Sequence, residues 1–186
     1  MKKSLLRRVL NRLLHLLARN CPGAATLRPF LHRLRGVAVS KRVWIGDDVY
    51  LENEYPELVQ LHEGVSLSIK SVIIAHTRGP GRVIIERNAF IGPGVLVVCP
   101  SGKTLRVGEG AVVSVGSVVT ASIPPGMIIA PPRSVPIGRA SVPYGSAKSL
   151  EEFIAGMEPL RRSPPPGRPG AAPSPPAPAV QPGPPT

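Results

Sequence analysis

The chain has 186 residues, of which 42% are hydrophobic and only 4% aromatic, so we expect one core filled mainly by Val, Ile and Leu. Its 24 prolines and 19 glycines argue against a largely helical or doubly wound domain and favour short strands with frequent turns. The formal net charge of +12 arises almost entirely before Asp47, the first acidic residue. Because the rest is nearly balanced, a nucleic-acid-binding core is not expected.

The two cysteines, Cys21 and Cys99, lie far apart in the sequence. This spacing predicts neither a zinc site nor a disulfide framework, so we expect no metal and a reducing compartment. No apolar run approaches the length that spans a bilayer. We therefore expect a cytoplasmic protein.

Residues 1–36 form a basic arm, in which residues 4–19 have the pattern of an amphipathic helix. Its leucines fall on one broad arc, and Arg8, Arg12 and Arg19 fall on the other. One interpretation is a helix lying on the anionic inner face of a membrane. Another is a helix that caps the core with its leucine face, and a transit peptide fits only in a eukaryotic host.

Residues 37–140 contain a repeat in which a branched aliphatic residue recurs every six residues. A six-residue period predicts a β-solenoid, with three hexads in each triangular turn and about four turns in all. The lead aliphatic side chains would stack in columns inside the coil. These lead positions are Val39, Ile45, Leu51, Leu61, Leu67, Ile73, Ile85, Ile91, Val97, Val107, Val113 and Val119.

The spacing lengthens between turns, which predicts projecting loops at 52–60, 74–84 and 98–106. Insertions on one side of a solenoid commonly form its binding face. The chain is expected to leave the solenoid after residues 123–126, an Ile-Pro-Pro-Gly stretch.

The remainder divides into a helical extension, 141–162, and a Pro-rich tail, 163–186. Ser149 and Glu152 have the spacing of a capping box, so we expect a short helix that ends near Glu158 and packs on the last turn. The tail has almost no apolar material and is expected to be disordered, without a chemical role.

His76 is the candidate catalytic residue of the repeat region. The repeats contain only one other histidine, His62, at a corner position expected to face solvent, whereas His76 begins the loop segment 76–82. Histidine is the side chain that titrates closest to neutral pH, so an accessible imidazole there is suited to accept a proton from a hydroxyl.

A series of motifs resembles the hexapeptide-repeat acyltransferases related to maltose and galactoside O-acetyltransferases. The similarity covers roughly residues 36–140, and the motifs are specific as a series rather than singly. They are Val43-Trp44-Ile45-Gly46, Tyr55-Pro56-Glu57-Leu58-Val59, Ile73-Ile74-Ala75-His76-Thr77, Phe90-Ile91-Gly92, Gly116-Ser117-Val118-Val119-Thr120 and Ile123-Pro124-Pro125-Gly126.

The resemblance implies an all-β, left-handed parallel β-helix that forms a homotrimer, with each site in a groove between neighbouring subunits. It implies acetyl-CoA, or another acyl-CoA, as co-substrate and a hydroxyl of a sugar or glycan as acceptor. His76 matches the family's general base, which deprotonates the acceptor for direct attack on the thioester without a covalent enzyme intermediate.

The resemblance also assigns the donor side of the site. Two matched positions flank the pantetheine arm and two lie near the CoA phosphates, where Arg133 or Arg139 takes the place of a family lysine. The four matched positions are Pro93, Val115, Thr120 and Ala121.

Glu52 has three interpretations. It matches the position near the acceptor-contacting asparagine of the galactoside enzymes, it orients His76, or it is a solvated corner carboxylate.

Other β-helix functions fit less well. A γ-class carbonic anhydrase needs three histidines on zinc, which His62 and His76 cannot supply. A serine acetyltransferase would show an Asp-His pair, and a nucleotidyltransferase would need a preceding nucleotide domain. The remaining alternative is a catalytically degenerate solenoid that acts as a scaffold or membrane-docked subunit.

Overall fold

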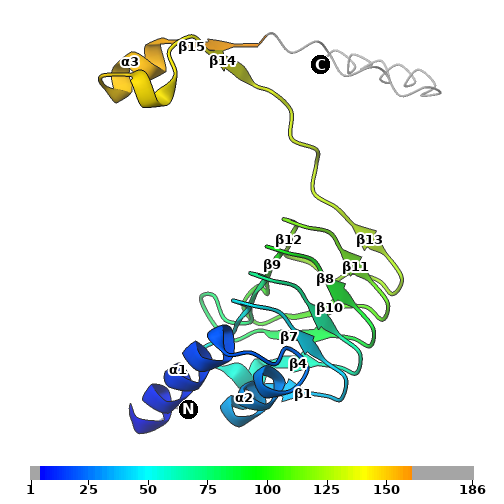
Figure 1. Ribbon diagram of the computed structural model, residues 1–186. Helices are drawn as coiled ribbons and strands as arrows, with labels where there is room; N and C mark the ends of the chain where they lie inside the picture. Colours follow the sequence, from blue (N-terminus) through cyan, green and yellow to red (C-terminus); the bar gives the residue numbers. More distant parts are fainter. Residues whose placement is uncertain (1–4, 161–186) are drawn as a thin grey trace, which may run out of the picture. The chain divides into compact units, whose positions relative to one another are not determined.

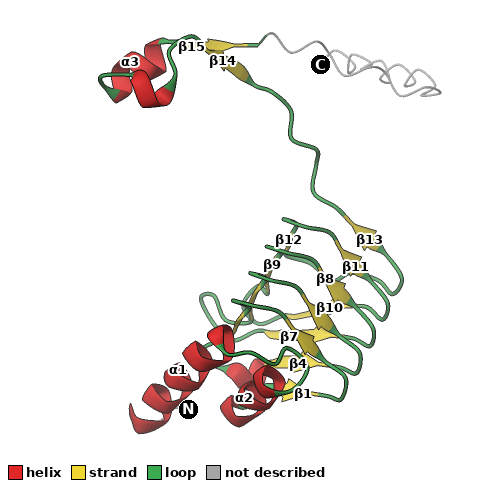
Figure 2. Ribbon diagram, viewed as in Figure 1, coloured by secondary structure: helices red, strands yellow, loops and turns green. Residues whose placement is uncertain are grey.

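The computed structural model describes residues 5–160, which divide after Pro132 into two compact units. The first unit begins with helices α1 (Leu5–Asn20) and α2 (Leu27–Arg35), which pack together at the first turn of a coil of short strands (Figures 1 and 2). The sequence pattern predicted α1 but not α2. The expected tail, 163–186, lies outside the described residues.

The coil has three faces of parallel strands, as expected for a left-handed β-helix of about four turns. Face A contains β1 (Ala38–Val39), β4 (Val59–Leu61), β7 (Arg82–Ile85) and β10 (Thr104–Val107). Face B contains β2 (Trp44–Ile45), β5 (Ser66–Leu67), β8 (Phe90–Ile91), β11 (Val112–Val113) and β13 (Ile128–Ile129). Face C contains β3 (Tyr50–Leu51), β6 (Val72–Ile74), β9 (Leu96–Val98) and β12 (Val118–Val119).

The strand register confirms the predicted columns of lead residues. On face B, for example, Ile45 lies over Leu67, Leu67 over Ile91 and Ile91 over Val113. Faces A and C repeat this pattern with the other lead residues. All the lead side chains except Val39 are buried, so the core is a column of branched aliphatics that needs almost no aromatic residues.

The corner between faces B and C requires left-handed backbone at one stacked position in every turn. Its occupants are Asp48, Lys70, Gly94 and Gly116, with φ angles of 54°, 57°, 62° and 68°. The amides of the last three donate to carbonyls of the preceding turn. This local geometry holds successive turns at a constant corner.

The coil continues further than the sequence pattern suggested. Ile123 bridges to Val107, and β13 pairs with β11 so that Ile129 lies over Val113. Ile123 and Ile129 keep the six-residue spacing, and the prolines between them make the corner rather than a stop. Gly108 lets the backbone at Pro125 pass close to the preceding turn, because a Cβ at residue 108 would lie 2.4 Å from the Pro125 nitrogen.

Both N-terminal helices pack with their polar faces inward. In α1 the buried side chains are Asn11, His15 and Ala18, whereas seven apolar side chains are between 44% and 78% exposed. In α2, Arg28, His32 and Arg35 are buried. The interpretation that the leucine face caps the core is therefore wrong.

The inward arginines satisfy carbonyl groups of the first turn, where no earlier strand can do so. Arg33 donates to the carbonyls of Val39 and Ser40 at the end of β1. Arg28 donates to the Ile45 carbonyl at the end of β2. Arg35 donates to the carbonyls of Leu51 and Glu52 at the end of β3. One arginine of α2 thus serves each face of the triangular coil.

The second unit contains β14 (Gly138–Ala140), the 3-10 helix η2 (Tyr144–Ser146), α3 (Leu150–Ala155) and β15 (Met157–Pro159). The Ser149 side chain accepts from the Glu152 amide, as the capping box predicted. The helix ends at Ala155 rather than near Glu158, because Met157–Pro159 pairs antiparallel with β14. Its packing on the last turn of the coil stays a prediction.

Replacing Ile91 with Ala should lower the free energy of unfolding by about 2–5 kcal/mol, because it leaves a cavity in the fully buried column of face B. The matched control is Ile128→Ala on the same face, where the side chain is 74% exposed and the loss should be about 0.5 kcal/mol or less. Denaturant unfolding followed by circular dichroism measures both. Equal losses would contradict the assignment of the core.

Candidate functional site

A groove of about 700 Å³ lies along the outer side of face C and contains both candidate catalytic residues. Strands β3 and β6 form its floor, α1 supplies part of its wall, and the corners before these strands and the loops after them supply the rest. Its lining residues are Arg12, Arg19, Asp48, Tyr50, Glu52, Asn53, Glu54, Lys70, Val72, Ile74 and His76.

His76 lies at the root of the loop that follows β6, and its side chain is half-buried. Its ring packs edge-on against the ring of Tyr55, with the centroids 4.9 Å apart. A bridge to Pro80 closes the loop on itself. The Pro80 carbonyl also accepts from the Gly102 amide, so the next projecting loop supports this one. These contacts hold the imidazole at the edge of the groove.

Glu52 is buried beneath the same corner, with 4% of its surface exposed. One carboxylate oxygen, Oε1, accepts from the amides of Glu54 and Tyr55 at 2.9 and 3.3 Å. The other, Oε2, accepts from the amide of Ala75 at 3.1 Å, directly before His76. The interpretation as a solvated corner carboxylate is therefore wrong. Among residues 5–160 no hydrogen bond joins the carboxylate to the imidazole, and its link to His76 runs through the backbone.

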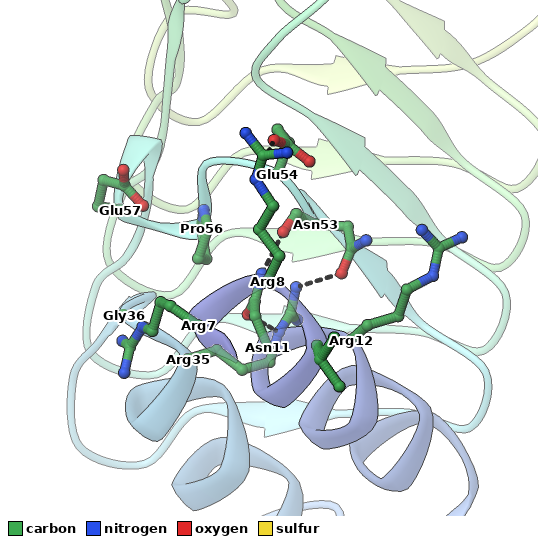
Figure 3. A pocket seen from close by; sticks show the side chains of 11 residues that line it. Arg7, Arg8, Asn11, Arg12, Arg35, Gly36, Asn53, Glu54, Pro56 and Glu57 are labelled. Carbon is green, nitrogen blue, oxygen red and sulfur yellow. Dashed lines mark hydrogen bonds and ion pairs between the residues drawn. The ribbon is translucent and has the colours of Figure 1, made fainter. Parts of the chain in front are cut away.

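Arg35 joins this corner to the N-terminal helices (Figure 3). Besides the carbonyls at the end of β3, its guanidinium donates to Asn11 Oδ1 at 3.0 Å and lies 2.9 Å from His32 Nδ1. The Asn11 side chain in turn donates to the Asn53 carbonyl. Burial lowers the pKa of Arg35 to about 10, which still leaves the group charged at neutral pH. One buried cation therefore ties α1, α2 and the loop after β3 together.

A second hollow of about 590 Å³ lies on the other side of the loop after β3 (Figure 3). It shares Arg12, Asn53 and Glu54 with the groove, so the two hollows adjoin. Arg7, Arg8 and Arg35 also line it, and Arg8 pairs with Glu54 at 3.8 Å. The surroundings of the groove are therefore rich in cations.

The groove is lined by three basic and three acidic side chains, and two of the basic ones are left without an ion pair within residues 5–160. Arg19 is paired with Asp48, whereas Arg12 and Lys70 take part in no ion pair with a described residue. Arg12 stands on the polar face of α1 and Lys70 on the corner before β6. Such a groove favours a ligand with an anionic group on this side.

The predicted donor-side residues lie elsewhere on the chain. Pro93 and Val115 occupy the corner between faces B and C in successive turns, and the Gly116 amide donates to the Pro93 carbonyl at 3.0 Å. Thr120 and Ala121 directly follow β12 and are exposed, and Arg133 begins the second unit. None of the four in the first unit lines the groove of His76, so the first unit does not bring these donor positions and the base into one groove.

Two residues of the site are not distinguished by the sequence pattern: Lys70, which lines the groove, and Tyr55, whose ring contacts His76. Tyr55 appeared only within a motif, and its ring contact with His76 depends on the fold of the loop after β3. Arg12 and Arg19 had a visible signal, because both belong to the charged face of residues 4–19. That signal was assigned to lipid headgroups, whereas in the structure both side chains line the groove.

Two histidines near the site are held neutral by burial. Desolvation, reinforced by the charge of Arg35, lowers the pKa of His15 from 6.5 to about 4. The same two causes lower the pKa of His32 well below its ordinary value. His15 Nδ1 lies 3.1 Å from Asn53 Oδ1, which is an acceptor, so the neutral ring carries its proton on Nδ1 in this packing. Among the described residues no group of three or more His, Cys, Asp or Glu has a metal-binding arrangement.

Comparisons with known proteins found a partial relative. Over 100 residues the chain is 30% identical to the 2,3,4,5-tetrahydropyridine-2,6-dicarboxylate N-acetyltransferase of Staphylococcus aureus, with the same figures for strains JH9, JH1 and COL. The match covers 54% of this chain and 38% of each relative, so the chain spans well under half of their length. No family model and no solved structure matches.

Acidification should loosen the contact of α1 and α2 with the coil. Below pH 6.5 the unfolded chain takes up protons at His15 and His32 that the folded chain does not, so stability is full above that pH and falls toward about pH 4. We expect a loss on the order of 2 kcal/mol by about pH 5 from His15, with a further loss from His32, measured by denaturant unfolding.

The variant His15→Asn keeps a donor for Asn53 and removes the titrating ring, so it should flatten the pH dependence. The control His62→Asn lies on a corner of the coil, and its pH dependence should match that of the unchanged chain. A slope that His15→Asn leaves unaltered would contradict the assignment.

Proposed function

We propose that this chain transfers an acyl group from acyl-CoA, most simply acetyl-CoA, to a hydroxyl of a sugar or glycan, with His76 as general base. One observation carries the proposal: a half-buried histidine stands at the edge of a groove of about 700 Å³, fixed by a loop and an aromatic ring. The similarity to an N-acetyltransferase over 100 residues supports acyl transfer as the reaction class.

The chemistry needs one base and no covalent enzyme intermediate. An imidazole nitrogen of His76 removes the proton from the acceptor hydroxyl as the oxygen attacks the thioester carbonyl. The tetrahedral intermediate then collapses, the C–S bond breaks, and the imidazolium returns the proton to the CoA sulfur. Backbone amides of the projecting loops are suitable donors to the transient oxyanion.

Glu52 acts in this proposal as a positioning residue. Its two oxygens accept from the amides of Tyr55, whose ring contacts the imidazole, and of Ala75, which directly precedes His76. A carboxylate that accepts several backbone N–H groups is fixed in place and fixes what it binds. The angle of the His76 ring therefore depends on Glu52 without a direct contact.

A homotrimer would complete the site. The donor positions Pro93, Val115, Thr120 and Ala121 do not line the groove of their own chain, and in the proposed trimer acyl-CoA bound by them meets His76 of a neighbouring subunit. The exposed side chain of Val115 is available for such a contact. Sedimentation analysis of the full chain tests the trimer.

The acceptor atom is the part of the proposal that the relative does not support, because its name specifies N-acetylation. Arg12 and Lys70 beside the groove favour an acceptor with an anionic group, such as a phosphate or carboxylate on a sugar. The purified chain should release CoA from acetyl-CoA with anionic sugars that lack a free amine. If the chain releases CoA only when an amine is supplied, the proposal of a hydroxyl acceptor is wrong and the proposal of acyl transfer stands.

Replacement of His76 with Ala should lower kcat/KM at least about 100-fold, because the general base is removed. The matched control is His62→Ala, a half-buried histidine on another corner, which should stay within about threefold of the unchanged chain. CoA release measured with a thiol reagent gives both values. Activity that survives His76→Ala within a few-fold would remove the base role.

Replacement of Glu52 with Gln should lower kcat at least about tenfold while the KM for acetyl-CoA changes less than about twofold, because only the base is displaced. The amide group of Gln presents N–H where one backbone amide needs an acceptor, so a stability loss of about 1–3 kcal/mol is also expected. Assays well below the unfolding temperature separate the two effects. Unchanged kcat would contradict the positioning role.

The alternative is a catalytically degenerate β-helix that serves as a scaffold, which the replacement of the family's lysine by Ala121 favours. Calorimetric titration of the full chain with acetyl-CoA distinguishes the two. Binding supports the enzyme, and a folded chain of the expected assembly that binds no acetyl-CoA supports the scaffold.

A further inference from the structure

Helices α1 and α2 present a surface of large apolar side chains. On α1 these side chains are between 44% and 78% exposed, and on α2 between 41% and 51%. Since the helices pack against each other, the two sets belong to one helical layer (Figure 1). The surface consists of Leu5, Leu6, Val9, Leu10, Leu13, Leu16, Leu17, Leu27, Phe30 and Leu34, and is called the leucine surface below.

Rotation of α1 and α2 about their axes cannot bury the leucine surface against the coil. The opposite side of α2 holds Arg28 and Arg35, which bond to carbonyls of the first turn and are almost fully buried. The opposite side of α1 holds Asn11 and His15, also buried. Turning the leucines inward would expose these bonded groups and leave the carbonyls unsatisfied, so the surface needs an external apolar partner.

The positive charge beside the leucine surface indicates which kind of partner it binds. Exposed arginines border the leucines on α1, namely Arg7 and Arg8, and the sequence has no acidic residue before Asp47. Two copies of this chain that met through the leucine surface would bring their arginines together, which opposes association. An anionic bilayer instead offers an apolar interior and a negative headgroup layer at the depth of the arginines.

The helices have the dimensions for an in-plane position. No described helix is long and apolar enough to cross a bilayer. Helix α1 has 16 residues with leucine on one side and bound polar groups on the other, the pattern of a helix that lies at the boundary of headgroups and acyl chains. Phe30 and Leu34 of α2 widen the apolar contact beyond a single helix.

We propose that α1 and α2 dock this chain on an anionic lipid surface, with the leucine surface in the acyl boundary and its bordering arginines at the headgroups. The proposal does not depend on acyl transfer. It extends the contact from residues 4–19 to a pair of helices whose orientation is fixed by the β-helix itself.

Vesicle flotation of the full chain tests the proposal. The chain should float with vesicles of phosphatidylcholine containing about 30% phosphatidylglycerol, and at least about tenfold less with phosphatidylcholine alone. High salt should weaken but not abolish the binding, because the apolar contact remains. Absence of flotation with the anionic vesicles would overturn the proposal.

The double variant Leu13→Glu with Leu17→Glu places two anions in the leucine surface and should weaken vesicle binding by at least tenfold. Both side chains are more than half exposed, so its unfolding temperature should be unchanged. The matched control is Leu150→Glu with Ile154→Glu on α3, which are equally exposed in the second unit. This control should bind vesicles like the unchanged chain.

Two further outcomes would contradict the proposal. If light scattering shows a self-association that Leu13→Glu with Leu17→Glu abolishes, and no variant floats, a second copy covers the leucine surface. If the α3 variant removes flotation as fully as the α1 variant, the lipid contact is not specific to the leucine surface.

Discussion

The unpaired carbonyl groups of the first turn are the constraint on which the N-terminal half of this molecule depends. Every later turn receives hydrogen bonds from a neighbour, whereas the first has none on its outer side. Arg33, Arg28 and Arg35 supply donors to the ends of β1, β2 and β3 in turn. Guanidinium groups suit this task, because each has several donors in one plane. Much of the basic arm therefore serves the fold.

The bonds between Arg35 and the first turn also determine the arrangement of the candidate site. Arg35 holds the carbonyl of Glu52, whose carboxylate holds the amides of Tyr55 and Ala75 beside His76. The arrangement of the base thus depends on a buried cation that does not line its groove. Low dielectric surroundings strengthen each of these bonds and make the loss of one partner costly. The site is rigid on the side of α1 and α2.

The six-residue period predicted the coil closely, because a buried column tolerates only branched aliphatics at positions such as Ile45 and Ile91. It misjudged the end of the coil, since prolines between Ile123 and Ile129 can turn a corner as well as stop a strand. The sequence could not predict which face of α1 is buried, because an amphipathic pattern shows only that the two faces differ. The sequence left three roles open for Glu52, among them the orientation of His76, because its partners are backbone amides, which carry no sequence signal.

Helix α1 is where the two proposals meet. Its polar side supplies Arg12 and Arg19 to the groove of His76, and its apolar side belongs to the leucine surface. A helix about 10 Å across would then separate the groove from the acyl boundary. An acceptor that carries an anionic group near a lipid anchor satisfies both sides of the helix at once, since its anion meets Arg12 while its anchor stays in the bilayer. A freely soluble acceptor would use only the groove and leave the orientation of the leucines without a catalytic consequence.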